Sequence, residues 1–413
     1  MQPLPFDLVL FEDSHVARLD PVATARPAYA VTCGSYRLID WVGLLGARAI
    51  RGNVRPHLRQ IQRLDFSQLA DEAASDSTAR LYINARLIAS RKNFELLRDW
   101  IKTNHPGAVT EGDELVAAMI PAGKSAPFGA DFSAISAATL PRLDIALKVA
   151  RYPHDVVRAN MENIRDNLEH RIASGVYQQV QDGVFVAAGA KLGANVVTQS
   201  ADGPIVLDEK ASIGPFCLLR GPIYVGKGTR VIEHAAIKDA VSIGHTCKIG
   251  GEVEAAVMEP FSNKQHHGFL GHSYLGSWIN LGAGTCNSDL KNTYGVVNMD
   301  YRGGKVATGM QFVGMMMGDY AKSAINTGIF TGKTIGVCSM LYGFITSNVP
   351  SFVNYARLFG QVTELPPEVM VATQQRMFAR RSVTQRPCDI QLIHDLYEIT
   401  REERQMASEP MAL

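Results

Sequence analysis

The sequence has no excess of charge of either sign. Its 413 residues include 41 Lys and Arg against 40 Asp and Glu, which gives a formal net charge of +1. This balance provides no long-range field to attract nucleic acid or an anionic membrane, so we expect the partners to be small molecules.

Cysteines are few and follow no known framework. The six cysteines, at positions 33, 217, 247, 286, 338 and 388, include no CxxC spacing. This excludes a zinc ribbon or a disulfide scaffold and indicates a reducing compartment.

Long apolar runs are also missing. No segment approaches the ~20 apolar residues that a membrane helix needs. The start, MQPLPFDLVLFED, has no basic residue and an apolar run of only about five residues, too short for a secretory signal. We therefore expect a cytoplasmic protein without a membrane segment.

What the sequence does contain is a repeat. A chain of 413 residues is too long for one core, and hydrophobic residues at 46% fit a globular protein of two or three domains. Aliphatic residues recur at a step of six at Leu207, Ile213, Leu219, Val225, Val231, Ile237, Ile243 and Ile249. The step resumes at Phe269, Leu275 and Leu281, and again at Ile329, Ile335 and Leu341.

This period is typical of a hexapeptide β-helix, in which three six-residue units form one triangular coil. The aliphatic side chain points inward and stacks about 4.8 Å from its equivalent in the next coil. Cys217 and Cys247 share one place in their hexads, so we expect both to be small buried side chains.

The remaining segments define four parts of the chain. We predict an α/β domain over 1–150, a helical connector over 151–179, a β-helix over 180–350 and C-terminal helices over 351–413. In the connector, Val157, Met161, Ile164, Leu168 and Ile172 follow a helical step. The two amphipathic C-terminal segments would cap the open edge of the last coil.

Two stretches of the repeat region carry the residues of a known family. IGPFCLLRGP and HHGFLGHSYLGSWINLGAGTCNSDLKN resemble the bifunctional bacterial family of N-acetylglucosamine-1-phosphate uridylyltransferase/glucosamine-1-phosphate acetyltransferase. The resemblance is strong over roughly 205–340. It implies a nucleotidyltransferase-like α/β domain, a left-handed parallel β-helix with acyltransferase activity, and a homotrimer.

The resemblance also implies roles for particular residues. His266 matches the catalytic base that takes a proton from the sugar amine as it attacks acetyl-CoA, which is the co-substrate. Asn287 matches the asparagine that orients the histidine or the amine. The other matches are Arg220 and Lys291 for phosphate, Asn280 for the sugar, and the backbone at Ala283 for the acyl group.

The sequence departs from the family at several of these places. A tyrosine of the family is Phe269 here, and a lysine is Ala256. The tyrosine after Cys-Asn is Ser288, and the serine on the acyl-donor side is Met315, whose bulk could exclude CoA. These departures leave the sugar, the nucleotide base and the acyl donor open.

The N-terminal domain resembles sugar nucleotidyltransferases more remotely. Their glycine-rich phosphate loop has no counterpart, since no glycine precedes Gly34. Arg18 and Arg26 are the candidate phosphate ligands. Mg²⁺ would accompany nucleotidyl transfer in this domain, yet the strand that should supply a metal-binding aspartate carries Asn84 and Arg86.

Three functions therefore remain open. The first is a sugar-nucleotide transferase acting on a sugar phosphate or nucleotide sugar. The second is a non-catalytic nucleotide-sugar-binding regulatory protein, and the third a trimerising scaffold. A metal site in the histidine-rich stretch is disfavoured, because the adjacent His266 and His267 would point in opposite directions on a strand.

Overall fold

The computed structural model describes residues 5–72, 74–112, 114–127, 132 and 140–407. The chain separates into two compact units. The first comprises Met1–Leu19, Arg26–Thr32 and Tyr36–Arg151, and the second comprises Asp20–Ala25, Cys33–Ser35 and Tyr152–Leu413.

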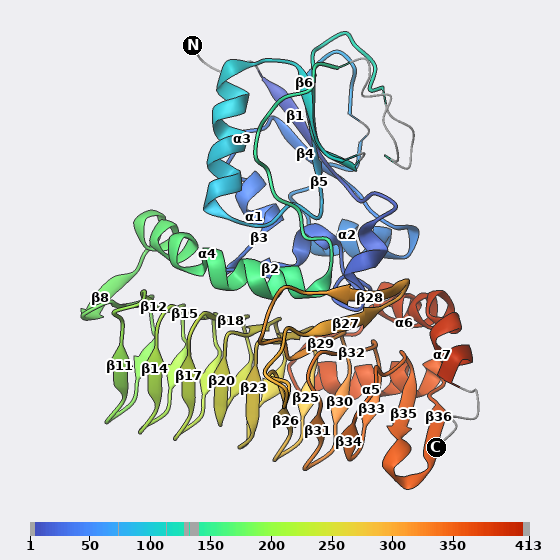
Figure 1. Ribbon diagram of the computed structural model, residues 1–413. Helices are drawn as coiled ribbons and strands as arrows, with labels where there is room; N and C mark the ends of the chain where they lie inside the picture. The colour runs from blue at the N-terminus through green and yellow to red at the C-terminus, as the bar shows by residue number, and fades with distance from the viewer. Residues whose placement is uncertain (1–4, 73, 113, 128–131, 133–139, 408–413) are drawn as a thin grey trace. The chain divides into compact units, whose positions relative to one another are not determined.

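The first unit is built on a five-stranded sheet with the order β4-β1-β5-β7-β6 (Figure 1). Its strands are β1 (Phe6–Phe11), β4 (Ala49–Asn53), β5 (Ala79–Asn84), β6 (Gly107–Glu111) and β7 (Glu114–Ile120). β4, β1 and β5 are parallel, whereas β7 is antiparallel to both of its neighbours. All six residues of β1 are buried, which explains its nearly continuous apolar run.

Helices and short segments complete this part of the chain. They are α1 (Leu38–Val42), α2 (Arg59–Asp65), α3 (Arg91–Thr103), the 3-10 turns Val16–Leu19, Ala28–Ala30 and Pro56–Leu58, and the strands β2 (Thr32–Cys33) and β3 (Tyr36–Arg37). The predicted α/β class is confirmed. β5 ends at Asn84, and α3 begins after Ser90, whose hydroxyl accepts a hydrogen bond from the Asn93 N–H at 3.2 Å.

The long continuous part of the second unit begins with α4 (Pro153–Ser174) and continues as a parallel β-helix. One sheet contains β10 (Lys191–Leu192), β13 (Ser212–Ile213), β16 (Arg230–Val231), β19 (Lys248–Ile249), β22 (Asn263–Lys264), β25 (Asn280–Leu281), β30 (Lys322–Ser323), β33 (Met340–Leu341), β35 (Val353–Ala356) and β36 (Gln361–Glu364). A second contains β8 (Gln178–Gln181), β9 (Val184–Val186), β12 (Ile205–Leu207), β15 (Ile223–Val225), β18 (Val241–Ile243), β21 (Val257–Met258), β24 (Tyr274–Leu275), β29 (Met315–Met317) and β32 (Lys333–Ile335).

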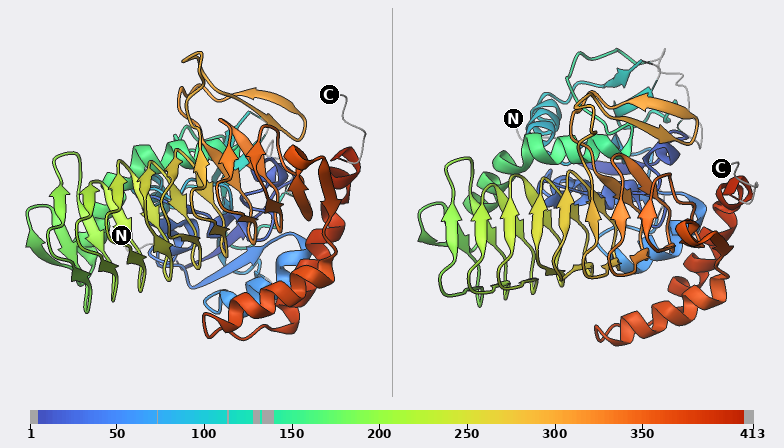
Figure 2. Two further views of the ribbon diagram at one scale, coloured as in Figure 1. Left: turned by 90° about the horizontal axis from the view of Figure 1, so that it is seen from below. Right: turned by 60° about the horizontal axis from the view of Figure 1, so that its bottom comes forward.

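The third side of the coils is divided between two sheets. The first part contains β11 (Val197–Gln199), β14 (Leu218–Arg220), β17 (Ala236–Lys238), β20 (Glu252–Glu254) and β23 (Phe269–Gly271). The second part contains β26 (Cys286–Asn287), β31 (Gly328–Ile329) and β34 (Phe344–Ile345). After β26 the chain leaves the coils as an antiparallel hairpin, β27 (Asn298–Tyr301) and β28 (Gly304–Ala307), which projects from the stack in Figure 2.

The predicted six-residue period corresponds to the interior of the β-helix. All eight aliphatic residues from Leu207 to Ile249 are buried in one hydrophobic cluster, together with Cys217 and Cys247. One assignment was wrong by a residue. Leu270 takes the inner position and Phe269 is partly exposed, because the loop between β22 and β23 changes the register.

α4 packs on this β-helix through part of its predicted apolar stripe. Ile164 and Leu168 are fully buried against Val206 and Tyr224 of the coils. Met161, in the same stripe, is 39% exposed and lies outside the contact.

The C-terminal segments form α5 (Pro367–Ala379), α6 (Pro387–Ile399) and α7 (Arg401–Ala407). The second of the two predicted amphipathic segments therefore forms two helices, α6 and α7, instead of one. The last coil ends in the antiparallel pair β35–β36, whose Glu364 accepts hydrogen bonds from Tyr397 and Arg404. α5 instead packs beside the coils, where Phe378 lies 4.4 Å from Trp278 between ring centroids. Among the described residues, no helix has the length and apolar character to cross a membrane.

Candidate functional site

In the first unit, polar side chains gather where the parallel strands β1 and β5 end. Asp13 lies two residues after β1, Asn84 ends β5, and Arg86 follows it. In open α/β sheets, ligands bind beyond the carboxyl ends of the strands, at the point where the strand order reverses. β1 is that point, since its neighbours are β4 on one side and β5 on the other.

The side chains at this edge are bonded to one another. The Arg86 guanidinium donates to Asp13 Oδ2 at 2.7 Å and to Glu114 Oε2 at 2.7 Å. Burial alone would lower the pKa of Arg86, but its hydrogen bonds to Asp13 and Glu114 raise it. The guanidinium is therefore firmly cationic.

Of the two arginines predicted to bind phosphate, Arg18 contacts this network, and Arg26 contacts Arg55. Arg18 donates to Glu114 Oε1 at 2.9 Å, so its charge already faces a carboxylate. Arg26 is partly buried, and its carbonyl accepts a hydrogen bond from Arg55 at 3.1 Å. Sequence reasoning missed Asp13, Arg86 and Glu114 as a group, because only the sheet brings these distant positions together.

Nucleotidyl transfer would require Mg²⁺, but these residues do not form a suitable site for the ion. Among the described residues, no group of three or more His, Cys, Asp or Glu side chains is arranged to hold a metal ion. At the edge of β1 and β5, the carboxylates of Asp13 and Glu114 already face the Arg86 guanidinium.

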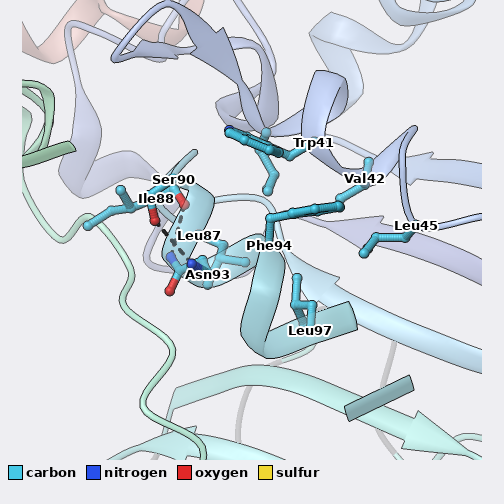
Figure 3. Close-up of a pocket in the computed structure, with 10 residues that line it drawn as sticks. Trp41, Val42, Leu45, Leu87, Ile88, Ser90, Asn93, Phe94 and Leu97 are labelled. Carbon is cyan, nitrogen blue, oxygen red and sulfur yellow. Dashed lines mark hydrogen bonds between the residues drawn. The ribbon is translucent and has the colours of Figure 1, made fainter. Parts of the chain in front are cut away.

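A hollow elsewhere in this unit is too small for a ligand. It lies between α1 and α3, is lined by Trp41 and Phe94 among other apolar residues, and holds about 10 Å³, roughly the room for one water molecule (Figure 3). Asn93 beside it bonds the carbonyl of Ile88 at 2.9 Å. This hollow is a feature of core packing.

In the β-helix, His266 lies in the loop between β22 and β23, where the six-residue step slips. Its side chain and that of His267 are exposed. Beneath the loop, Lys264 occupies an interior position and is 2% exposed. Its amine donates to the carbonyls of Gly250 at 2.9 Å and of His266 at 2.8 Å, so it fixes the backbone of the loop. Burial lowers the pKa of Lys264 to about 8.

Asn287 lies in the interior, at the break in the third side of the coils. Its Oδ1 accepts from the Gly271 N–H at 3.0 Å, and its Nδ2 donates to the Gly271 carbonyl at 3.0 Å. β23 and β26 are adjacent but belong to different sheets. The amide of Asn287 therefore replaces the backbone bonds that a paired strand would supply to Gly271.

A histidine that sequence reasoning did not select lies at the other end of β23. His272 Nδ1 is 2.8 Å from Asp289 Oδ2, and the ring stacks on Phe312 at 5.2 Å. The only sequence signal was its membership of the histidine-rich stretch. Its carboxylate partner is 17 residues away and could not be identified from spacing.

The other predicted residues are distributed over several coils. Arg220 pairs with Asp239, through Nε to Oδ1 at 2.7 Å, and its pKa is raised by this hydrogen bond. It lies three strands before Gly271 in the same sheet, or about 14 Å at the usual strand spacing. Asn280 is exposed on β25, and Lys291 donates to the carbonyl of Val296 at 2.7 Å.

Ala283 and Met315 are the two positions predicted to lie on the acyl-donor side, and Met315 differs from expectation in the direction of its side chain. The carbonyl of Ala283 accepts from the Asn326 N–H at 2.7 Å. Met315 is 1% exposed and belongs to the interior hydrophobic cluster. Its bulk therefore fills the core of the β-helix and does not project from the outer face.

Comparison with known proteins gives two kinds of match. Residues 8–174 match the family described as sugar nucleotidyl transferase. A bifunctional protein GlmU from Alkalilimnicola ehrlichii is 29% identical over 164 residues, which are 34% of this chain and 32% of that protein. A bifunctional sugar-1-phosphate nucleotidylyltransferase/acetyltransferase from Sulfurisphaera tokodaii is 29% identical over 97 residues, covering 23% of this chain and 24% of that protein.

The chain is thus similar to the GlmU proteins over part of its length. The resemblance predicted from the sequence is thereby confirmed. The chain spans about a third of the length of the curated relatives it matches. Among solved structures, the acetyltransferase domain of PglB from Neisseria gonorrhoeae in complex with acetyl coenzyme A is 10% identical, covers 87% of this chain and 98% of that one, and has a TM-score of 0.18. A TM-score this low supports no argument.

Proposed function

We propose that the chain is a transferase of sugar-nucleotide metabolism whose β-helix transfers an acetyl group from acetyl-CoA to an amino sugar phosphate or its nucleotide. The observation that carries this proposal is the position of His266. It is exposed on the loop where the repeat slips, and the loop backbone is fixed from below by the Lys264 amine at 2.8 Å. The family match over residues 8–174 and the GlmU relatives support the sugar-nucleotide class of substrate.

In this reaction His266 acts as the general base. The amine of the sugar attacks the thioester carbonyl, a C–N bond forms and the C–S bond breaks. His266 takes the proton that the amine loses and passes it to the leaving CoA thiolate, which gives the free thiol and returns His266 to its starting state. Asn280, Phe269, Lys291 and Arg220 are the candidate sugar and phosphate contacts, and the backbone at Ala283 is the candidate acyl contact. The core position of Met315 favours access of CoA, since its side chain does not occupy the outer face.

For the first unit we propose binding of a phosphate-bearing sugar or nucleotide, with Arg18 and Arg26 as the candidate ligands. A second function, binding without catalysis, is favoured by one observation. The carboxylates of Asp13 and Glu114, which would otherwise be the candidate metal ligands for nucleotidyl transfer, are each paired with Arg86 at 2.7 Å. We further propose a cytoplasmic homotrimer, the assembly that the family resemblance implies.

The test follows thiol release from acetyl-CoA with glucosamine 1-phosphate and other amino sugars as acceptors. His266→Ala should lower turnover by ~10²- to 10⁴-fold with little change in KM, the usual contribution of a general base. His267→Ala is the matched control, because His267 is adjacent and also exposed but has no proposed part in the proton transfer. Its substitution should lower turnover far less. Absence of thiol release with every acceptor, together with no binding of CoA by calorimetry, would rule out acyl transfer and leave the binding function.

A further inference from the structure

The carboxyl edge of β1 and β5 is the place where this type of sheet binds its ligand, and two carboxylates lie there. Asp13 and Glu114 are largely buried, with side chains 4% and 15% exposed. Two converging carboxylates are the ligands that Mg²⁺ prefers in sites that handle phosphates. Whether an ion can bind depends on what these oxygens already contact.

Every oxygen of the two carboxylates accepts a hydrogen bond from an N–H group. Asp13 Oδ1 accepts from Arg86 Nε at 3.1 Å and from the His15 backbone at 3.1 Å. Asp13 Oδ2 accepts from Arg86 and from Asn84 Nδ2 at 2.8 Å. On Glu114, one oxygen accepts from Arg86 and the other from Arg18.

The charges balance within this group. Two carboxylates face two guanidiniums, and the Arg86 side chain is fully buried, with 0% exposed. Arg86 also donates to the carbonyl of Ala150 at 3.3 Å, so its guanidinium is held by the backbone as well as by the two carboxylates. A divalent ion could reach Asp13 and Glu114 together only by expelling Arg86, which would leave a charged group buried without partners.

We infer that Arg86 is a built-in cation that takes the place of a divalent ion at this edge, so the first unit holds its ligands without Mg²⁺. The Arg86 guanidinium lies within 2.7 Å of both carboxylates, where an ion would bridge them. This inference concerns the first unit and is independent of acyl transfer by the β-helix. Nucleotidyl transfer with Asp13 and Glu114 as metal ligands is thereby excluded.

The direct test titrates the full-length chain with Mn²⁺ and follows the signal of the free ion by electron paramagnetic resonance. We expect no bound Mn²⁺ that depends on these carboxylates. Binding of one ion per chain that is lost in Asp13→Asn or Glu114→Gln would overturn the inference. Arg86→Met should create such a site, whereas Arg86→Lys, which keeps the charge, should not.

Arg86→Met removes a buried charge and could fail to fold, so a second measurement uses the unaltered chain. The change in melting temperature that UTP produces should be the same in EDTA and in Mg²⁺. A larger shift in Mg²⁺ that disappears in Glu114→Gln would contradict a metal-independent edge. Neither measurement depends on His266, so failure of acyl transfer would not affect the result.

Discussion

At the scale of single residues, Asn287 acts on the backbone of its neighbour. It carries a polar amide into an inner position, yet both ends of that amide are bonded to Gly271. The resemblance to the family predicts an orienting role for Asn287. The contacts with Gly271 indicate how such a role would work, because β23 carries the loop of His266 at its start.

This arrangement gives a prediction for stability. Asn287→Leu retains an inner side chain but leaves the Gly271 N–H without its acceptor, which should cost about 1–3 kcal/mol in the free energy of unfolding. Urea denaturation followed by circular dichroism would measure the loss. Asn280→Ala, at an exposed position on the neighbouring coil, should change stability by no more than about 0.5 kcal/mol. Equal effects of the two substitutions would contradict the bonding role.

Lys264 gives a prediction for pH dependence. Burial lowers its pKa from 10.5 to about 8, so between these values the unfolded chain binds more protons than the folded chain. Stability therefore rises with pH through this window, and the cost of the buried charge is fully present below pH 8.

The measurement compares the unaltered chain with Lys264→Met from pH 7.5 to pH 10.5. The difference in unfolding free energy between the two should shift in favour of the unaltered chain as the pH rises. Using the difference removes the contribution of Lys322, whose pKa is also about 8 because of burial. A difference that stays constant across the window would show that the ammonium is not destabilised by burial.

These residue contacts mark the limit of what the sequence could predict. The place of His266 in the family motif was readable. The contacts of Lys264, Asn287 and Arg86 were not, because each depends on a partner brought close by another strand, and residue type alone does not identify the partner. The pair His272–Asp289 was missed for the same reason.

At the scale of elements, the structure was predicted better in segments with a periodic sequence than in and next to loops. The eight aliphatic hexads define the interior because each inner residue must stack on the next coil. The register was lost at Phe269, where a loop of different length precedes the strand. The hairpin β27–β28 was likewise not predicted, because its residues leave the six-residue step, although Gly303-Gly304 in its turn is a turn signal.

The helix α4 allows a test of its own packing. Ile164→Ala should lower the free energy of unfolding by about 2–5 kcal/mol, because the side chain is fully buried against the coils and its removal leaves a cavity. Met161→Ala is the matched control on the same helix. Since Met161 is 39% exposed, its loss should be within about 0.5 kcal/mol. A large loss for Met161→Ala would mean that the helix buries a different face.

At the scale of the whole molecule, the exposed apolar surface of the β-helix bears on how copies of the chain assemble. The β-helix keeps large apolar side chains exposed near its later coils, among them Phe330 at 50% and Phe344 at 56%. Phe344 opens β34, and Phe330 follows the neighbouring strand β31, so both belong to the same side of the coils. Exposed apolar groups that gather on one face indicate a surface that binds another protein.

We expect that surface to be covered by further copies of the chain around a threefold axis, since the flat sides of a triangular coil can pack in that way. Light scattering at micromolar concentration should give three times the chain mass of 45.0 kDa. Phe344→Glu would place a charge in the contact and should lower the average mass, whereas Leu64→Glu, at a side chain already 55% exposed on α2 of the first unit, serves as a control for added charge. A mass of a single chain for the unaltered protein would contradict the trimer. It would also mean that every group needed for acyl transfer must come from one chain, so His266 would have to work with Asn280 and the backbone at Ala283 of its own coils.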